Sequence, residues 1–559
     1  MSEILTPQTL WKDYDETDIE LNERTVHSYE EDGVNFSEVY YDGVSGERNT
    51  ARVFAVTAHV KDEQPEKQPV MLLIDGVNRN TDKELMHFWA RQGYLVILPD
   101  YCGGNGMRTI YPEELRYCNY AEAGRHYTHV DTSAKDTCWY NWAYCMRRTL
   151  AYVQKVYGSS EFYVYGRYEG VRLAMMLLGL DKRIKAGALL FGCLWEDVGK
   201  EYIAGEKSEG FDLKSRLEME EEQERRLAGI SPQTYAAMIE VPVYIVQGTN
   251  ATNADIIKNY EVSFRMKNLF GSTFVYLPRM TQGYGKDVDE LIAVWFSSPP
   301  PARQPEIKAE VKNGCLQAHV DLMRMDNAEN AEIYFSRGNA PQYVRNWIKA
   351  NDVKMLIDDC FVQIEVTDLD APVYMFANVT ADGQVFSSRI ISVVPSRIGV
   401  SVTSEPTKLI YKGKFGVAEF VPMDPTKPQT PEFVRNNPVV AAAGAFDVMG
   451  IKGRALATFA LNDDNVRISP DSALTFDVCS AVQQEMKVYY LTDWGNANSK
   501  GYSVSVSLVG GKLWQKVSIT QEDFKSLSGT SAQNKETQNK KLLAFVAEEE
   551  IILNNILFT

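Results

Sequence analysis

The chain of 559 residues is 45% hydrophobic and 24% charged, a composition that allows more than one buried core and predicts two or three domains. Its 58 basic and 75 acidic side chains give a formal net charge of −17, which argues against a nucleic acid or an anionic membrane as the partner. The eight cysteines are scattered without a C-x-x-C pair, so the sequence predicts neither a disulfide scaffold nor a bound metal.

The N-terminal sequence, MSEILTPQTLWKDYDETDIE, lacks the basic start and the apolar stretch of a signal peptide. No later run approaches the ~18 apolar residues that are needed to span a bilayer. We therefore expect a cytoplasmic protein with reduced thiols.

Residues 1–298 alternate strands with helices, as a doubly wound α/β sheet requires. Two antiparallel strands, FSEVYYDG and ARVFAVTAHV, come first, and continuous apolar runs typical of strands buried on both faces follow them. These runs cover residues 69–77, 94–101, 184–195, 241–249 and 272–281. A highly charged helix within about 198–238 is expected to cover the sheet edge as a cap with a solvated face.

The segment SSPPPARQP (297–305) ends this pattern, because consecutive prolines cannot continue a helix. Short alternating strands over residues 306–395 predict a small immunoglobulin-like β-sandwich. Residues 396–559 continue in short strands and predict a second all-β unit, a C-terminal jelly roll.

Residues 163–174, YVYGRYEGVRLA, predict a strand that ends in a Gly-x-x-x-Gly turn and opens a helix. In a G-x-S-x-G elbow, small residues let a sharp turn present the central side chain near backbone N–H groups that can receive an oxyanion. Here the central residue is Tyr168. A phenol, with an unperturbed pKa of about 10, is bulkier than a serine hydroxyl and is rarely an acyl carrier.

The first 300 residues resemble an α/β-hydrolase of the acetyl xylan esterase-like or dienelactone hydrolase-like kind. The resemblance rests on the stretch from Trp11 through the DGVN turn at 75–78, the LPDYCG strand end, the DTCWYNW helix start, the GRYEG elbow, and the VQGTNA and LPRMTQGYG strand ends. The C-terminal unit is similar to galactose-binding-like jelly rolls of carbohydrate-active enzymes, in GGKLWQKVSI and ILNNILF. The first resemblance implies a carboxylic ester hydrolase in which an acid and then a histidine follow the nucleophile.

This chain departs from the implied triad at every position. The acid position falls on Ala251, the histidine position falls on Gln282, and none of the six histidines lies between the elbow and residue 297. At the oxyanion turn, Asp75 stands within a segment where the family would show a His-Gly-Gly type sequence, and its carboxylate would repel a developing oxyanion. The sequence therefore favours a pseudoenzyme, because loss of a triad member removes several orders of magnitude in rate.

Other side chains could supply the missing groups if the site lies elsewhere. The candidate acids are Glu196, Asp197 and Asp255, and the candidate bases are His126 and His129. Each histidine is more often a structural or surface residue. Cys102 is the best substitute nucleophile, although a buried, inert thiol is the simpler interpretation.

A silent site can still bind a ligand. The upper edge of the sheet is expected to gather aromatic and charged side chains suited to a sugar: Asp75, Arg108, Trp139, Trp142, Arg167, Tyr168 and Glu169. The alternative is that Trp139 and Trp142, three residues apart on a helix, pack in the core.

In the C-terminal unit, Tyr489, Tyr490 and Trp494 are candidates for a glycan-binding platform, whereas Trp514 is expected to face the core. The acidic turn LNDDN (461–465) could hold calcium, but a solvated loop is the default. No phosphate-binding loop or dinucleotide fingerprint is present, so no cofactor is expected.

Two function classes follow. The first is a non-hydrolytic protein that binds carbohydrate or another small molecule. The second is an active carbohydrate (acetyl) esterase with a non-standard nucleophile.

Overall fold

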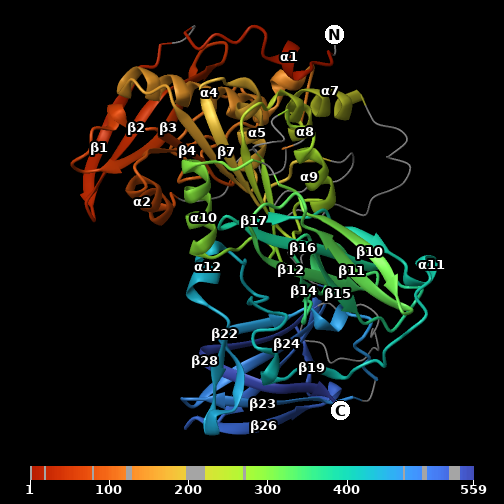
Figure 1. The fold of residues 1–559 in the computed structure, drawn as a ribbon. Helices are drawn as coiled ribbons and strands as arrows, with labels where there is room; N and C mark the ends of the chain where they lie inside the picture. Colours follow the sequence, from red (N-terminus) through yellow and green to blue (C-terminus); the bar gives the residue numbers. More distant parts are fainter. Residues whose placement is uncertain are drawn as a thin grey trace.

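The computed structural model describes residues 3–17, 20–77, 81–120, 127, 129–196, 221–267, 272–301, 303–469, 472–493, 500–527 and 542–559. Figure 1 shows three units that follow one another along the molecule: a sheet covered by helices, a β unit in the middle, and a second β unit that contains the last strand.

The first unit is built on a nine-stranded sheet with the order β1-β2-β3-β5-β4-β6-β7-β8-β9. The strands joined by antiparallel pairing are β1 (Arg24–Glu31), β2 (Val34–Ser45), β3 (Thr50–Val60) and β5 (Leu95–Asp100). The other strands run parallel to β5: β4 (Val70–Ile74), β6 (Phe162–Arg167), β7 (Ile184–Leu190), β8 (Val243–Gly248) and β9 (Thr273–Leu277). This mixed sheet confirms the predicted α/β class of the first unit.

Side chains of the parallel strands enter two cores, one on each face of the sheet. On β4, Leu72 and Ile74 belong to one core, whereas Met71 and Leu73 belong to the other. The helices that contribute to the first core are α4 (Cys138–Tyr157), α5 (Gly170–Leu180) and α9 (Ile256–Ser263). The second core includes α2 (Lys83–Arg91) and α10 (Lys286–Ser297). Helices therefore cover both faces of the sheet, as the continuous apolar runs predict.

The predicted cap lies partly outside the described residues, since these omit 197–220. Its described part forms α7 (Glu221–Ile230) and α8 (Pro232–Tyr235), and α7 lies close to α1 (Pro7–Leu10). The acidic start of α7 is solvated, as expected, but Ile230 and Tyr235 are fully buried in the first core. The last residues of the predicted cap are therefore part of the core and pack beside α5.

The second unit consists of two antiparallel sheets that share one hydrophobic core. One sheet contains β10 (Glu306–Lys312), β11 (Cys315–Asp321), β15 (Asp359–Ile364) and β14 (Lys354–Met355). The other contains β13 (Ile348–Lys349), β12 (Ala328–Arg337), β16 (Val373–Ala381), β17 (Gln384–Ser387) and β18 (Ile391–Val393). These sheets confirm a β unit after the prolines, and its immunoglobulin-like type remains a prediction.

The third unit is a ten-stranded sheet that branches at one long strand, β28 (Leu542–Phe558). β28 pairs with β22, β24, β23 and β19, so it supplies backbone hydrogen bonds to four other strands. The strands of this unit before β28 are β19 (Leu409–Tyr411), β20 (Phe420–Pro422), β21 (Val440–Ala443), β22 (Met449–Thr458), β23 (Leu474–Ser480), β24 (Gln484–Asp493), β25 (Lys500–Leu508), β26 (Leu513–Ile519) and β27 (Lys525–Ser526). A jelly roll remains a prediction for this β unit.

Candidate functional site at the elbow after β6

The turn between β6 and α5 has the backbone geometry of a nucleophile elbow. Tyr168 has a φ of 54°, a left-handed conformation that is uncommon for a residue with a side chain. Its N–H donates to the carbonyl oxygen of Leu190 (3.0 Å). A Cβ atom added to Gly170 would lie 2.3 Å from the carbonyl oxygen of Ile74, so only glycine allows this close approach. The elbow predicted from the glycine spacing is therefore present.

The side chain of Tyr168 is buried, with 3% exposure, and does not project into open solvent. Its hydroxyl donates to the backbone carbonyl oxygen of Gln282 (3.2 Å), and its ring lies nearly parallel to that of Phe191, with 6.5 Å between the centroids. The structure thus brings together Tyr168 and Gln282, the predicted nucleophile and histidine positions. The contact joins a hydroxyl to a backbone carbonyl and involves no imidazole.

Side chains from the second and third units form hydrogen bonds with the loops after β8 and β9. These are the two loops that would carry the acid and the histidine of a triad. Gln342, which precedes β13, donates to the carbonyl oxygens of Ala251 (2.9 Å) and Ala254 (2.8 Å). Gln429, which precedes α12 (Pro431–Asn436), accepts from the hydroxyl of Thr281 (2.7 Å), next to Gln282. Ala251 is buried. Side chains from outside the first unit therefore contact the loops at the carboxyl ends of β8 and β9.

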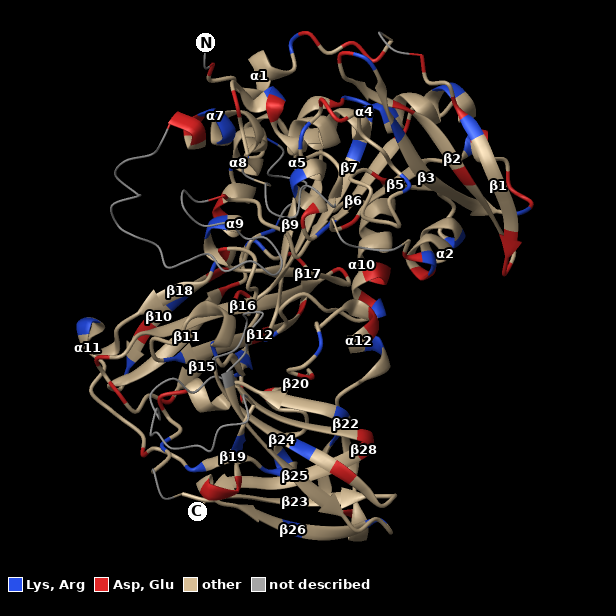
Figure 2. Cartoon of the chain, turned by 180° about the vertical axis from the view of Figure 1, so that it is seen from behind, with Lys and Arg blue, Asp and Glu red and all other residues tan. Residues whose placement is uncertain are grey.

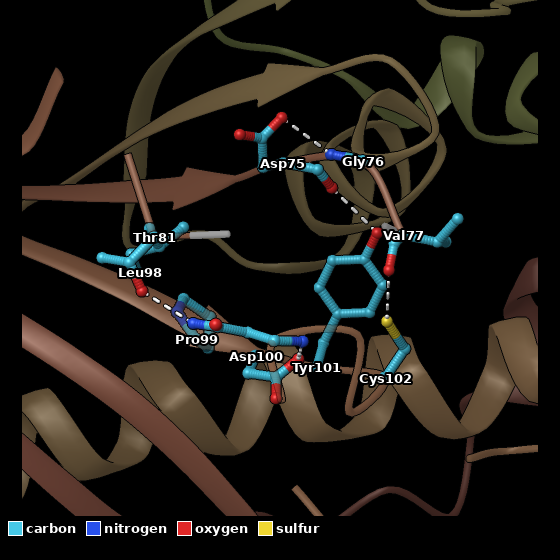
Figure 3. A pocket seen from close by; sticks show the side chains of 10 residues that line it. Asp75, Gly76, Val77, Thr81, Leu98, Pro99, Asp100, Tyr101 and Cys102 are labelled. Carbon is cyan, nitrogen blue, oxygen red and sulfur yellow. Dashed lines mark hydrogen bonds between the residues drawn. The ribbon is translucent and has the colours of Figure 1, made fainter. Parts of the chain in front are cut away.

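The oxyanion turn after β4 is also occupied. One carboxylate oxygen of Asp75 accepts from the N–H of Gly76 (2.8 Å), and the backbone oxygen of Asp75 accepts from the hydroxyl of Tyr101 (2.8 Å). Figure 3 shows these contacts beside Cys102. The other carboxylate oxygen forms an ion pair with Arg167. The prediction that the carboxylate of Asp75 would repel an oxyanion is therefore corrected. Arg167 balances the charge of this carboxylate, which also accepts a hydrogen bond from the N–H of Gly76.

Arg167 is the centre of a buried network that the sequence did not reveal. Besides Asp75, it pairs with Asp82 (2.9 Å) and donates to the hydroxyl of Tyr284 (3.4 Å). The hydroxyl of Tyr284 lies 3.0 Å from that of Tyr165, which donates to Asp289. Burial raises the pKa of Asp289 to about 6, against the opposing effects of Tyr165 and Arg167. No local signal marks Tyr165 as a neighbour of Tyr284 and Asp289, because about 120 residues separate it from both in the chain.

Cys102 does not behave as a nucleophile. Its thiol is buried and donates to the carbonyl oxygen of Val77 (3.3 Å), as Figure 3 shows. Burial raises the pKa of Cys102 well above its usual value, so the thiol stays protonated. The cavity beside it, between the ends of β4 and β5, measures about 20 Å³ and has room for little more than one water molecule. The buried, inert thiol is therefore the interpretation that the structure supports.

The alternative acids and bases that the structure describes have partners elsewhere. Asp255 caps α9 by accepting from the N–H groups of Ile257 and Lys258. The imidazole of His129 lies 3.2 Å from Asp131. His126 and Asp197 lie outside the described residues. These contacts give neither Asp255 nor His129 a role at the elbow.

Glu196 joins α7 to α5 through a buried ion pair. Its carboxylate pairs with Arg172 (3.1 Å) and Arg226 and accepts from the hydroxyl of Ser231 (3.2 Å). Burial alone would raise the pKa of Glu196, but the two arginines outweigh it and lower the pKa to about 2. The role of Glu196 is therefore structural.

We expect Glu196→Gln to lower the free energy of unfolding by about 2–3 kcal/mol at pH 7. Because the folded pKa lies below the unfolded value of about 4.5, this stabilisation is complete above pH 4.5 and is lost as the pH falls toward 2. Urea denaturation of wild type and variant at several pH values measures the difference. A difference that stays constant from pH 7 to pH 3 would contradict the assignment.

The predicted sugar-binding aromatics of the first unit are core residues. Trp139 and Trp142 are at most 2% exposed, and their indole N–H groups donate to the carbonyl oxygens of Tyr127 (3.0 Å) and Cys118 (2.8 Å). Arg108 is exposed and pairs with Glu38 on β2 (3.1 Å). The prediction that Trp139, Trp142 and Arg108 line a pocket is therefore wrong. Glu169 is partly exposed at the start of α5, next to Tyr168.

The C-terminal candidates are also placed differently. Tyr489 is buried in a small core shared with Val344 of the second unit, and Tyr490 is partly buried against Phe524. The prediction that these tyrosines form a glycan-binding platform is therefore wrong. Trp494, the third candidate, lies outside the described residues. Trp514, expected in the core, is partly exposed.

The LNDDN turn is an interdomain contact. Both carboxylate oxygens of Asp463 accept from Arg337 of the second unit, each at 2.8 Å. An arginine in this position excludes calcium from that carboxylate. Within the part of the chain that the structure describes, no cluster of three or more His, Cys, Asp or Glu side chains could hold a metal, and no helix is long and apolar enough to cross a membrane.

No family model matches this sequence, and no curated protein matches it. Among solved structures, an acetyl xylan esterase from a Paenibacillus species is 16% identical, with a TM-score of 0.41, over 51% of this chain and 90% of that protein. Acetyl xylan esterase 1 from a Thermoanaerobacterium species is 16% identical, with a TM-score of 0.40, over 50% of this chain and 89% of that protein. Est1E from Butyrivibrio proteoclasticus, solved with ferulic acid bound, is 15% identical, with a TM-score of 0.33, over 44% of this chain and 96% of that protein.

Proposed function

We propose that this chain is a non-hydrolytic protein built on an α/β-hydrolase-like domain. The observation that carries the proposal is the buried phenol of Tyr168, whose hydroxyl donates to the backbone of Gln282 at the position where a catalytic histidine would stand. A serine or cysteine nucleophile needs a neighbouring base, and the contact at this position is a carbonyl oxygen. Such a site retains at most the small rate enhancement that binding alone supplies.

The contacts that the second and third units make with the loops after β8 and β9 also support a non-hydrolytic protein. Substrate would have to displace the contacts that Gln342 and Gln429 make with the loops after β8 and β9. Hydrolysis by Cys102 as the alternative nucleophile is not favoured, because its thiol is buried, protonated and hydrogen-bonded to a carbonyl oxygen.

We expect purified protein to hydrolyse p-nitrophenyl acetate and acetylated xylo-oligosaccharides no faster than the buffer does. Tyr168→Phe and Cys102→Ala should leave this background unchanged. Tyr163→Phe is the matched control, because Tyr163 lies on the same strand and its hydroxyl binds Glu161 at the surface. Turnover that disappears in Tyr168→Phe or Cys102→Ala, but persists in Tyr163→Phe, would instead establish the esterase alternative.

We also propose that the third unit binds carbohydrate, at the tip of the hairpin formed by β21 and β22. Phe446 at this tip is 87% exposed, and Asp447 follows it. The indole N–H of Trp514 donates to the carbonyl oxygen of Ala445 (2.9 Å), so a second aromatic ring lies beside the tip. An exposed ring offers an apolar face to sugar C–H groups, and a carboxylate can accept from hydroxyl groups.

Binding to a glycan array tests this part of the proposal. We expect Phe446→Ala to abolish binding and Val509→Ala, a change at another exposed apolar residue of the same unit, to leave it unchanged. Equal loss in both variants, or equal retention, would exclude the hairpin as the binding site.

The hairpin tip also predicts a stability effect. Phe446 and Asp447 both have a φ of 58°, the backbone of a type I′ turn, which favours Asn-Gly. We expect the double change Phe446→Asn with Asp447→Gly to raise the free energy of unfolding of the third unit by about 1–2 kcal/mol, because it removes this strain. Urea denaturation measures the gain, and an unchanged or lower midpoint would contradict it.

A further inference from the structure

A cavity of about 390 Å³ lies between α2, α10 and α12, away from the elbow loops. Its size is in the range of small-molecule sites. Figure 2 shows these three helices close to one another at one side of the molecule. Arg435 on α12 lines the cavity and forms an ion pair with Glu84 on α2 (3.2 Å), so the third unit supplies part of the wall.

Asp289 is the most buried charged group in the wall of this cavity, with 4% exposure. One of its carboxylate oxygens accepts from the hydroxyl of Tyr165. The other oxygen accepts no hydrogen bond from any residue that the structure describes, and Asp289 forms no ion pair among these residues. A buried carboxylate in this condition is costly unless a charged donor pairs with it.

Two of the three cations that line the cavity are engaged elsewhere, and the third, Lys286, is exposed. Arg435 pairs with Glu84, and Arg91 donates to the backbone oxygen of Asp32 (3.2 Å). Arg167, behind the cavity wall, pairs with two other aspartates. Four acidic side chains line the cavity against three basic ones: Asp32, Glu84, Asp289 and Glu290 against Arg91, Lys286 and Arg435. The excess of acidic over basic side chains and the buried position of Asp289 therefore favour a ligand with positive charge.

We propose that this cavity binds a small organic molecule through an ammonium group that donates to the free carboxylate oxygen of Asp289. The side chains of Leu85 and Phe88, which also line the cavity, offer apolar surface to the carbon skeleton of the ligand. A compact ammonium with three donors suits a site that offers one free carboxylate oxygen, whereas a neutral hydroxyl forms a weaker hydrogen bond there. Neither Tyr168 nor Phe446 is among the residues that line this cavity.

Isothermal titration calorimetry with two matched pairs of probes tests the proposal: glucosamine with glucose, and cadaverine with 1,5-pentanediol. We expect the amine of at least one pair to bind about tenfold or more tightly than its hydroxyl partner, since a hydrogen bond to a charged group contributes more than a neutral one. The pair that responds distinguishes an amino sugar from an aliphatic amine. No binding of either amine at 10 mM, or equal binding of amine and hydroxyl partner, overturns the proposal.

Variants locate the binding. Asp289→Asn keeps an acceptor for Tyr165 but removes the charge, and we expect it to weaken amine binding by about tenfold or more. Asp287→Asn, at an exposed residue of α10 that is not among those lining the cavity, is the matched control and should change binding by less than about twofold. If Asp289→Asn does not fold, Phe88→Trp is tested instead. The larger side chain fills part of the cavity, and we expect it to weaken amine binding. Unchanged binding in a folded Asp289→Asn, or in Phe88→Trp, overturns the proposal.

Discussion

Replacing Arg167 by methionine will lower the free energy of unfolding by about 3–5 kcal/mol, because it leaves buried carboxylates without their counter-ion. The Arg167 side chain is 6% exposed, and its partners Asp75 and Asp82 are 10% and 23% exposed. Methionine retains most of the volume but supplies no donor. Arg167 also donates to Tyr284, so the hydroxyl network that reaches Asp289 loses one end.

Arg52→Met is the control for this experiment, since Arg52 also pairs with an aspartate, Asp42, but is 33% exposed. We expect the control to cost no more than about 1 kcal/mol. Urea denaturation followed by tryptophan fluorescence compares the variants. Equal losses in Arg167→Met and Arg52→Met would show that the pairs around Arg167 contribute no more than a surface ion pair.

Replacing Arg337 by methionine will also cost about 3–5 kcal/mol, and this loss will appear in the contact between the second and third units. Arg337 donates to both carboxylate oxygens of Asp463 and to the backbone oxygen of Glu365 (2.9 Å). The side chains of the pair are 9% and 3% exposed. Without the guanidinium, Asp463 stays buried as an uncompensated charge. Limited proteolysis should therefore cleave between the units faster in the variant than in wild type.

A double change separates the charge effect from simple loss of packing. Arg337→Met combined with Asp463→Leu removes both charges, and we expect its stability to lie within about 2 kcal/mol of wild type, above that of Arg337→Met alone. A double variant less stable than the single one would show that the polar contacts of Arg337, and not the unpaired Asp463, determine the loss.

Local sequence features predicted the sheet and the elbow well, because both depend on short-range patterns. Continuous apolar runs such as 69–77 and 94–101 correspond to strands buried on both faces, β4 and β5. Gly166 and Gly170, four residues apart, predicted the sharp turn that holds Tyr168 at a positive φ. The prolines at 299–301 lie between the end of α10 at Ser297 and the first strand of the β units.

The surroundings of the elbow could not be predicted in the same way. Gln342 and Gln429 belong to other units, and nothing in their own sequence indicates that they reach the loops after β8 and β9. Helical spacing showed that Trp139 and Trp142 share a face, but not whether that face meets a pocket or the core. Tyr489 and Tyr490 are adjacent on a strand and point to opposite faces, and the pattern alone did not identify the face that the second unit covers.

The branched sheet of the third unit has a consequence for synthesis on the ribosome. β28, made after every other strand of this unit, lies between β22 and β24 and also pairs with β19 and β23. Before residues 542–558 leave the exit tunnel, pairs such as β21–β22, β24–β25 and β23–β26 can form, but the strand edges that bind β28 have no partner. This unit therefore cannot fold progressively from its first strand during translation, and its nascent chain exposes apolar strand edges until β28 arrives.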